Sequence, residues 1–229
     1  MRRAVIFDAG NTLLRMNYRA IAAHLTGRGR AVSAAEVEEA ELRGRARLDA
    51  HPDTARSTES AATRERYVRY LLEPLGIIDE AEVADIGRWR STFNAPWGMW
   101  TEADPDAPAA LCRVKDAGLR VGVISNSNGR AGAILEAAGL GAHLDFVIDS
   151  GIVGVEKPDP RIFALALAEA GAQPQEAVYV GDLYSVDVLG ARAAGLDAVL
   201  IDPRGHGGPR DCPVARGIAH AVALVLGEG

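Results

Sequence analysis

The hydrophobic pattern predicts alternating strands and helices over most of the chain. Val5-Ile6-Phe7 is an unbroken apolar run with β-branched and aromatic members, which is typical of a strand covered on both faces of a parallel sheet. From Pro105 onward, similar apolar runs alternate with amphipathic stretches. Strands are predicted at 119–124, 146–148, 177–180 and 198–201, and helices at 106–117, 130–138, 159–170, 185–194 and 214–226. The pattern therefore predicts an α/β fold, a Rossmann-like doubly wound parallel sheet.

Residues 15–94 follow a different pattern, with no strand signal. Ser33, with Glu36 three residues later, predicts the start of an amphipathic helix that continues to Leu48. Further helices are predicted at 58–73 and 79–92. The sequence thus predicts an α-helical domain over 15–94, inserted into a core formed by 1–14 and 95–229, with hinges near 14–17 and 94–100.

Composition excludes several classes of function. The chain has 229 residues and a net charge of −6, without a dense patch of lysine and arginine, so nucleic-acid binding is not expected. No apolar run approaches the ~20 residues that span a membrane. Cys112 and Cys212 form neither a disulfide framework nor a metal-binding spacing, so we expect a reducing, cytoplasmic location. An acidic protein that handles an anion must gather positive charge locally or use a metal ion.

Polar residues follow three of the predicted strands. Asp8, Ser125-Asn126 and Asp182 each come directly after an apolar run. The carboxyl ends of parallel strands meet at one edge of the sheet, where open α/β sheets bind their ligands. We expect Lys157 at the same edge; it is one of only two lysines, against 23 arginines. Two carboxylates there would repel each other, and a divalent cation with a preference for oxygen ligands, such as Mg²⁺, relieves this.

Four motifs in order resemble the haloacid dehalogenase superfamily. They are Asp8-Ala9-Gly10-Asn11-Thr12, Val123-Ile124-Ser125-Asn126-Ser127, Lys157-Pro158, and Gly181-Asp182 with Asp187 five residues after Asp182. The resemblance covers roughly 1–14 and 95–201, and residues 15–94 lie where this superfamily carries its C1-type helical cap. It implies a Mg²⁺-dependent hydrolase, most simply a phosphatase acting on a small phosphate ester.

The resemblance also implies roles for individual residues. The implied catalytic residues are Asp8, a nucleophile that forms an aspartyl-phosphate, together with Ser125 and Lys157. The implied phosphate-binding residues are Ser125, Asn126, Lys157 and Asn11. The implied metal-site residues are Asp8, the backbone carbonyl of Gly10, Asp182 and Asp187, the last acting through water or a hydrogen bond.

Gly10 departs from the pattern of the superfamily's phosphatases, which carry an aspartate two residues after the nucleophile as general acid and base. Since general acid–base catalysis contributes ~10²–10⁴-fold, the site is expected to protonate an alkoxide leaving group poorly.

Three alternative functions follow from this departure. A metal-independent 2-haloacid dehalogenase also lacks that aspartate, but Asp182 and Asp187 argue against it. A phosphonate hydrolase needs a cap lysine, and 15–94 contain none. A catalytically weak phosphate-binding regulatory protein stays open.

Two further features have less specific interpretations. Arg43, Arg45 and Arg47 spread around a predicted helix and are expected to form a solvated face. The segment 96–100, with two tryptophans, is expected to pack at the hinge rather than stack on substrate.

Overall fold

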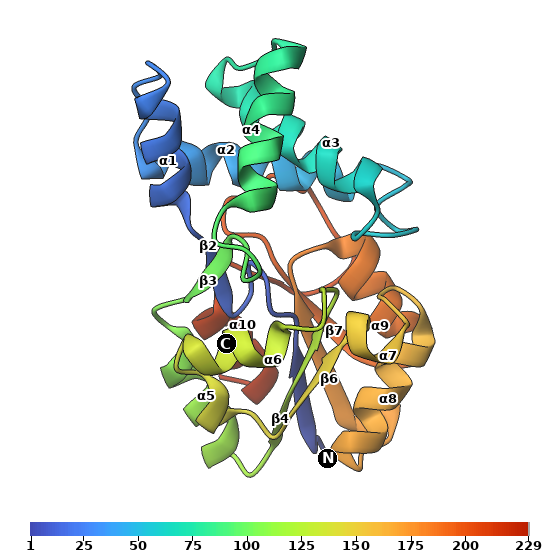
Figure 1. The fold of residues 1–229 in the computed structure, drawn as a ribbon. Helices are drawn as coiled ribbons and strands as arrows, with labels where there is room; N and C mark the ends of the chain where they lie inside the picture. The colour runs from blue at the N-terminus through green and yellow to red at the C-terminus, as the bar shows by residue number, and fades with distance from the viewer. Residues whose placement is uncertain (229) are drawn as a thin grey trace.

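A computed structural model describes residues 1–228 and contains a six-stranded parallel sheet of order β5-β4-β1-β6-β7-β8 (Figure 1). The register pairs Phe7 of β1 with Val123 of β4 and with Val180 of β6. The order places β1 in the middle, between the two strands that also end in predicted site residues. The strands are β1 (Ala4–Phe7), β4 (Arg120–Ser125), β5 (Phe146–Asp149), β6 (Ala177–Gly181), β7 (Asp197–Ile201) and β8 (Val214–Ala215).

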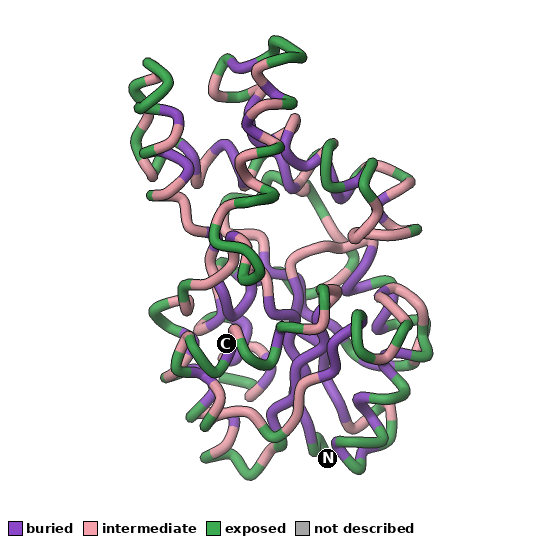
Figure 2. Tube along the Cα trace, in the orientation of Figure 1, coloured by how far each residue is buried: buried purple, intermediate pink, exposed green. Residues whose placement is uncertain are grey.

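Helices cover both faces of this sheet, and α5, α6 and α10 lie opposite α7, α8 and α9 (Figure 1). Strand residues alternate between two hydrophobic clusters, with Val5 and Phe7 in one and Ala4 and Ile6 in the other, all fully buried (Figure 2). The doubly wound α/β prediction is confirmed. The helices are α5 (Ala107–Asp116), α6 (Ala131–Ala137), α7 (Ser150–Val153), α8 (Pro160–Ala170), α9 (Leu189–Ala193) and α10 (Ile218–Leu226), with short 3₁₀ turns at Gly141–His143 and Pro174–Glu176 and a π turn at Tyr184–Val188.

Four helices lie beyond the carboxyl ends of the strands (Figure 1). They are α1 (Tyr18–Gly27), α2 (Ala34–Asp49), α3 (Ala61–Leu72), followed by a 3₁₀ turn at Glu73–Leu75, and α4 (Glu80–Thr92). They pack around a third hydrophobic cluster that includes Leu25, Val37 and Ile86. The predicted cap of α2 is present, because Ser33 Oγ accepts from Glu36 N and the Glu36 carboxylate accepts from Ser33 N. That residues 15–94 behave as a separate domain stays a prediction.

A small two-stranded sheet joins the helical part to the core, where the sequence predicted no strand. β2 (Leu14–Met16) pairs antiparallel with β3 (Trp100–Ala103). Strands of three and four residues are too short to show a period, and their partners are distant in sequence, so the pattern could not reveal them. The predicted last helix also begins later than expected, because Val214–Ala215 form the edge strand β8 and α10 starts at Ile218.

Within residues 1–228, none of the helices combines the length and the apolar character needed to cross a membrane.

Candidate active site

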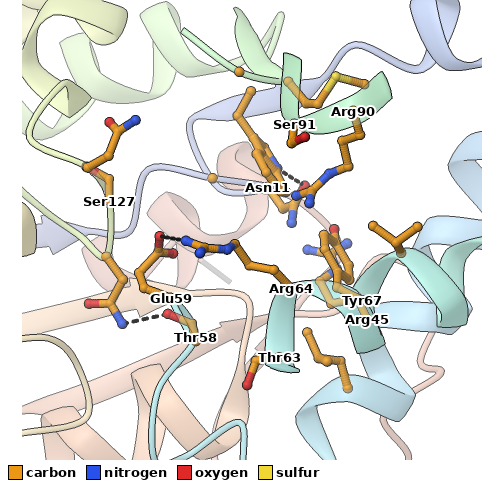
Figure 3. Close-up of a pocket in the computed structure, with 18 of the residues that line it drawn as sticks. Asn11, Arg45, Thr58, Glu59, Thr63, Arg64, Tyr67, Arg90, Ser91 and Ser127 are labelled. Carbon is orange, nitrogen blue, oxygen red and sulfur yellow. Dashed lines mark hydrogen bonds and ion pairs between the residues drawn. The ribbon is translucent and has the colours of Figure 1, made fainter. Parts of the chain in front are cut away.

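Asp8, Ser125 and Asp182 lie together where three neighbouring strands end. Asp8 follows β1, Ser125 ends β4, and Asp182 follows β6. All three line a cavity of about 1000 Å³ between the sheet edge and helices α2 to α4. Figure 3 shows other residues that line this cavity, among them Asn11, Arg45 and Tyr67. The sequence prediction that these strand ends meet is therefore confirmed as geometry, although the chemical roles of the residues remain predictions.

Lys157 occupies the centre of the charged groups. Its Nζ donates to Asp8 Oδ1 (2.5 Å), to Asp187 Oδ1 (2.8 Å) and to the Tyr179 hydroxyl (2.9 Å). The side chain is 3% exposed. Burial by itself would lower the pKa of Lys157, but the carboxylates of Asp187 and Asp8 outweigh it and hold the pKa well above its ordinary value. The neighbouring carboxylates therefore favour the charged ammonium form of Lys157 beside the predicted nucleophile.

The two cavity-facing carboxyl groups have perturbed pKa values. Burial raises the pKa of Asp8 to about 8; the Lys157 ammonium opposes this shift, while Asp187 and Asp182 add to it. Burial likewise raises the pKa of Asp182 to about 6 against the opposing effect of the Arg45 guanidinium. Closely spaced carboxylates with too little compensating charge are the expected setting for a bound cation.

The acidic cluster offers oxygen atoms to a metal ion. Single oxygens of Asp8, Asp182 and Asp187 lie within 4.8 Å of one another. Both carboxylate oxygens of Asp187 already accept hydrogen bonds. Oδ1 accepts from Lys157 Nζ, and Oδ2 accepts from the backbone N–H groups of Asp182 (3.1 Å) and Leu183 (2.9 Å). Among residues 1–228, Asp8 Oδ2 and Asp182 Oδ1 accept no hydrogen bond. The donor set fits a hard cation held by Asp8 and Asp182, with Asp187 fixing the loop that carries Asp182.

Gly10 faces an indole ring where the superfamily's phosphatases carry a carboxylate. A Cβ added to Gly10 would lie 3.4 Å from Trp100 Cδ1, which is ordinary van der Waals contact. Trp100 Nε1 donates to Asn11 Oδ1 (2.8 Å), and Asn11 Nδ2 donates to Asp182 Oδ2 (3.3 Å). Asn11 adopts a left-handed φ of 55°, which asparagine tolerates better than most residues. Its amide thus connects Trp100 to Asp182, and its predicted contact with phosphate stays a prediction.

Asn126 holds the lysine loop in place. Its Oδ1 accepts from Lys157 N (2.8 Å), and its Nδ2 donates to Lys157 O (2.9 Å) and to Thr58 Oγ1 (2.9 Å). These bonds use the whole side-chain amide, so any contact with phosphate would fall to its backbone. Thr58 belongs to the helical part, and this bond is one of its contacts with the sheet edge (Figure 3).

Arg45 contradicts the prediction of a solvated face on α2. Its side chain is 8% exposed, and its Nη1 lies 2.7 Å from Asp182 Oδ2. Its Nε lies 3.2 Å from Glu41, which is fully buried and also accepts from the hydroxyls of Tyr67 (2.6 Å) and Tyr18 (3.2 Å). Arg43 and Arg47 do remain on the surface. The prediction for Arg45 was wrong because helical position alone does not reveal that α2 lies over the sheet edge.

Comparison with known proteins identifies the family. A family model described as haloacid dehalogenase-like hydrolase matches residues 2–195. The chain belongs to this family. It is therefore a hydrolase of the haloacid dehalogenase superfamily, as its four motifs predicted.

Individual relatives match over different lengths. The human haloacid dehalogenase-like hydrolase domain-containing protein 3 is 33% identical over 207 residues, 87% of this chain and 81% of that protein. The ribulose-1,5-bisphosphate 5-phosphatase of Halopiger xanaduensis is 31% identical over 218 residues, 89% of this chain and 86% of that protein. The Thermus thermophilus phosphoserine phosphatase is 42% identical over 99 residues, 43% of this chain and 40% of that protein. The Bos taurus haloacid dehalogenase-like hydrolase domain-containing protein 3 also matches, but this match covers only about half of the Bos taurus protein, 53% of its length.

A solved structure described as a dehalogenase shares the fold, with a TM-score of 0.64, 24% identity, and coverage of 97% of this chain and 96% of that one.

The motifs of the haloacid dehalogenase family did not reveal what the helical part and β3 contribute. Arg45 and Tyr67 from the helical part and Trp100 from β3 all line the cavity, and Tyr67 and Trp100 stack with ring centroids 5.8 Å apart. The only sequence feature that pointed to these cavity residues is the pair of tryptophans at 97 and 100, for which the sequence predicts packing at the hinge.

Proposed function

We propose that this hydrolase is a Mg²⁺-dependent phosphatase that acts on a small phosphorylated metabolite. The observation that carries the proposal is the pairing of two uncommitted carboxylate oxygens, Asp8 Oδ2 and Asp182 Oδ1, with a buried ammonium, Lys157. The relatives named as phosphatases support this activity over dehalogenation. We also propose a cytoplasmic location, in keeping with the free thiols of Cys112 and Cys212.

The proposed reaction begins with attack by Asp8 on phosphorus, which forms an aspartyl-phosphate, breaks the bond from phosphorus to the ester oxygen and releases the leaving group as its oxyanion, which takes a proton from water. The Ser125 hydroxyl binds a phosphoryl oxygen, and the Lys157 ammonium, whose three donors are held by Asp8, Asp187 and Tyr179, stabilises through its positive charge the negative charge that develops on the phosphoryl group. Asp8, Asp182 and the Gly10 carbonyl would hold Mg²⁺, which supplies Lewis-acid stabilisation of the phosphoryl group. Asp187 keeps Lys157 and the Asp182 loop in position. Water then hydrolyses the intermediate and regenerates Asp8.

Gly10 sets the proposed preference for leaving groups. Residue 10 is a glycine and has no carboxylate, and a side chain there would point toward Trp100. No group at this position therefore protonates a departing alkoxide. An aryl oxide or acyl group leaves without such help, so these phosphates are the proposed better substrates. The same absence slows activation of water, so the aspartyl-phosphate is expected to accumulate and to give a burst of product.

Residues 15–94 are proposed to act as a cap that closes over the cavity and selects the substrate. Thr58 and Arg45 contact the sheet edge, and β2 and β3 join the cap to the core at the predicted hinges. Closure would exclude water during the reaction.

A catalytically weak phosphate-binding protein is the second candidate, favoured by Gly10 alone. Turnover of 4-nitrophenyl phosphate with Mg²⁺, and its loss on chelation, is the test of the phosphatase proposal. Asp182→Asn should abolish the turnover that depends on Mg²⁺, because the variant lacks one of the proposed metal ligands. Full turnover in the chelator would contradict it, and a parallel assay for halide release from 2-haloacids would then decide for a dehalogenase. Phosphate binding without turnover would decide for the weak binder.

A further inference from the structure

The cavity contains a cation that the proposed reaction does not use. Arg90, on α4, extends into the cavity toward Tyr67 (Figure 3). Its guanidinium carbon lies 5.4 Å from the Trp100 ring centroid and 5.7 Å from the Tyr67 ring centroid. The two stacked aromatic rings therefore hold one side of the guanidinium group and leave its N–H groups available to a ligand.

Arg90 differs from the other basic residues around the cavity in having no acidic partner. Among residues 1–228, it makes no salt bridge and no side-chain hydrogen bond. Arg64 lies 3.6 Å from Glu59, and the remaining cavity cations are paired in the same way: Arg45 with Asp182, Arg69 with Glu80, Arg88 with Asp85, and Lys157 with Asp8. Arg90 is thus the cavity cation that forms no direct ion pair with the described residues.

An unpaired guanidinium in this position is costly without a ligand. The residue is half-buried, and burial lowers the pKa of Arg90, which means that the charged form has lost part of its hydration. Glu59 forms its ion pair with Arg64 and acts on Arg90 only through space, where its charge opposes part of the pKa shift. A buried charge is normally paired, so a ligand anion is the natural partner.

The indole ring of Trp100 lies between Arg90 and the loop that carries the proposed nucleophile, and it therefore relates Arg90 to the proposed phosphoryl site. A Cβ added to Gly10 would lie 3.4 Å from Trp100 Cδ1, and Trp100 Nε1 donates to Asn11, while the Arg90 guanidinium lies over the indole ring. Lys157 is already committed to Asp8 and Asp187. One ligand could therefore place its phosphoryl group at Asp8 and a second anionic group at Arg90.

We propose that Arg90 determines specificity by binding a second anionic group, a carboxylate or a second phosphate, on the organic part of the substrate. A guanidinium fork pairs with either group through two parallel hydrogen bonds. The proposal rests on the phosphatase function proposed above and narrows its substrate class to small phosphate esters that carry a second negative charge.

The test compares aryl phosphates that differ in one group. The substrates are phenyl phosphate, the ring isomers of carboxyphenyl phosphate, the matching uncharged carbamoylphenyl phosphates, and 1,3- and 1,4-phenylene bisphosphate. We expect the wild type to prefer at least one charged compound over its uncharged match, through KM more than kcat. Arg90→Met keeps the packing stem but removes the charge, and should lower kcat/KM for that compound by about 10- to 100-fold with little effect on phenyl phosphate.

Control variants separate this role from a structural one. Arg43→Met, on α2 in an exposed pair with Glu39 and outside the cavity, should retain the preference. Arg90→Lys should recover part of it, because the charge remains and the fork is lost. If Arg90→Met does not fold, the preference of the wild type and of Arg90→Lys still tests the proposal. The carboxylate and bisphosphate series distinguish the two kinds of anion.

Binding by calorimetry in an Asp8→Asn background separates the two proposals. If no phosphate ester is hydrolysed but the charged compounds bind through Arg90, the phosphatase proposal fails and the anion site stands. If phenyl phosphate is hydrolysed but charged and uncharged compounds are equivalent, the anion site is wrong. An equal loss on all substrates in Arg90→Met would also overturn it.

Discussion

A single ammonium group holds together carboxylates from separate segments of the chain. Lys157 lies between Asp8, after β1, and Asp187, in the turn after β6, and its hydrogen bond to Tyr179 completes the group. Because all four side chains are buried, the charges gain strength from the low dielectric but would be costly if left unpaired. The same residue therefore has a structural role and a proposed catalytic role, and the two can be tested separately.

The two lysines of the chain provide a matched test of the structural role. Lys157→Met leaves Asp8 and Asp187 without their common partner and should lower the free energy of unfolding by about 3–5 kcal/mol. Lys115→Met removes a surface pair with Asp145 and should cost at most about 1 kcal/mol. Urea unfolding of the three proteins measures both changes. Equal losses in the two variants would mean that Lys157 is not needed to compensate the buried carboxylates.

Gly10 is the residue at which acid–base catalysis can be restored. It does not adopt a positive φ, and its Cβ direction meets the Trp100 ring at contact distance, so an aspartate should fit after a small rotation of its carboxylate. Gly10→Asp is expected to raise turnover of alkyl phosphates by up to ~10²-fold and to change aryl phosphates much less. Steady-state kinetics on both classes measures the ratio.

Gly10→Ala is the control for bulk at this position, and Mg²⁺ affinity should stay the same in both variants. If Gly10→Asp folds, binds Mg²⁺ as before and gains nothing on alkyl phosphates, then the proton comes from another group, and the cap side of the cavity is the first place to look.

At the scale of elements, helix α2 makes the most direct polar contact between the helical part and the sheet edge. Arg45 binds Asp182, and one turn later Asp49 accepts from Ser185 N (2.7 Å) and from Arg210 (3.1 Å). The four-residue spacing places both side chains on one face of the helix, which is the face turned to the core. The closed position of the proposed cap therefore depends on a few polar contacts together with the β2–β3 connection.

Loss of one of these contacts should favour opening. Arg45→Met removes the bond to Asp182 and also the ion pair with the buried Glu41, which keeps only its two tyrosine hydroxyls, so urea unfolding of the variant must first show that the helices stay folded. Amide hydrogen exchange at the Asp182–Ser185 segment should rise about 10-fold, the equivalent of ~1.4 kcal/mol. Arg47→Met, which removes a pair with Glu73 inside the helical part, should leave this segment unchanged. Unchanged exchange in both variants would argue against opening at this contact.

At the scale of the whole molecule, the acidic site links stability to pH and metal. Asp8 and Asp182 have pKa values raised to about 8 and about 6 from an ordinary value of 3.8. Between about pH 4 and pH 8, the two carboxyl groups bind more protons in the folded protein than in the unfolded chain. The contribution of Asp8 and Asp182 to the free energy of unfolding is therefore greatest below about pH 4 and is lost as the pH rises to about 8. A cation that replaces those protons should reverse the loss.

We therefore expect Mg²⁺ to raise the melting temperature more at pH 8 than at pH 5.5, because protons compete with the metal at the lower pH. Differential scanning calorimetry with and without MgCl₂ at the two pH values measures the difference. Asp182→Asn should reduce the metal effect at both. A shift that is independent of pH would mean that the cation binds outside this carboxylate cluster.

The sequence by itself determined the elements that depend on local pattern. The apolar runs of β1, β4, β6 and β7 and the polar residues directly after them were sufficient to predict a parallel sheet and the meeting of Asp8, Ser125 and Asp182, because strand ends in such a sheet share an edge. The capping box at Ser33 and Glu36 likewise needed only neighbouring residues.

Only the tertiary structure decided how the helical part meets this edge. The burial of Arg45 against Asp182, the contact of Trp100 with Gly10 and the exposure of Arg90 to the cavity each depend on the placement of helices relative to the sheet. The short strands β2 and β3 pair residues more than 80 positions apart, so the local hydrophobic pattern could not predict them. The proposed choice of substrate depends on these long-range contacts, which no local pattern in the sequence reveals.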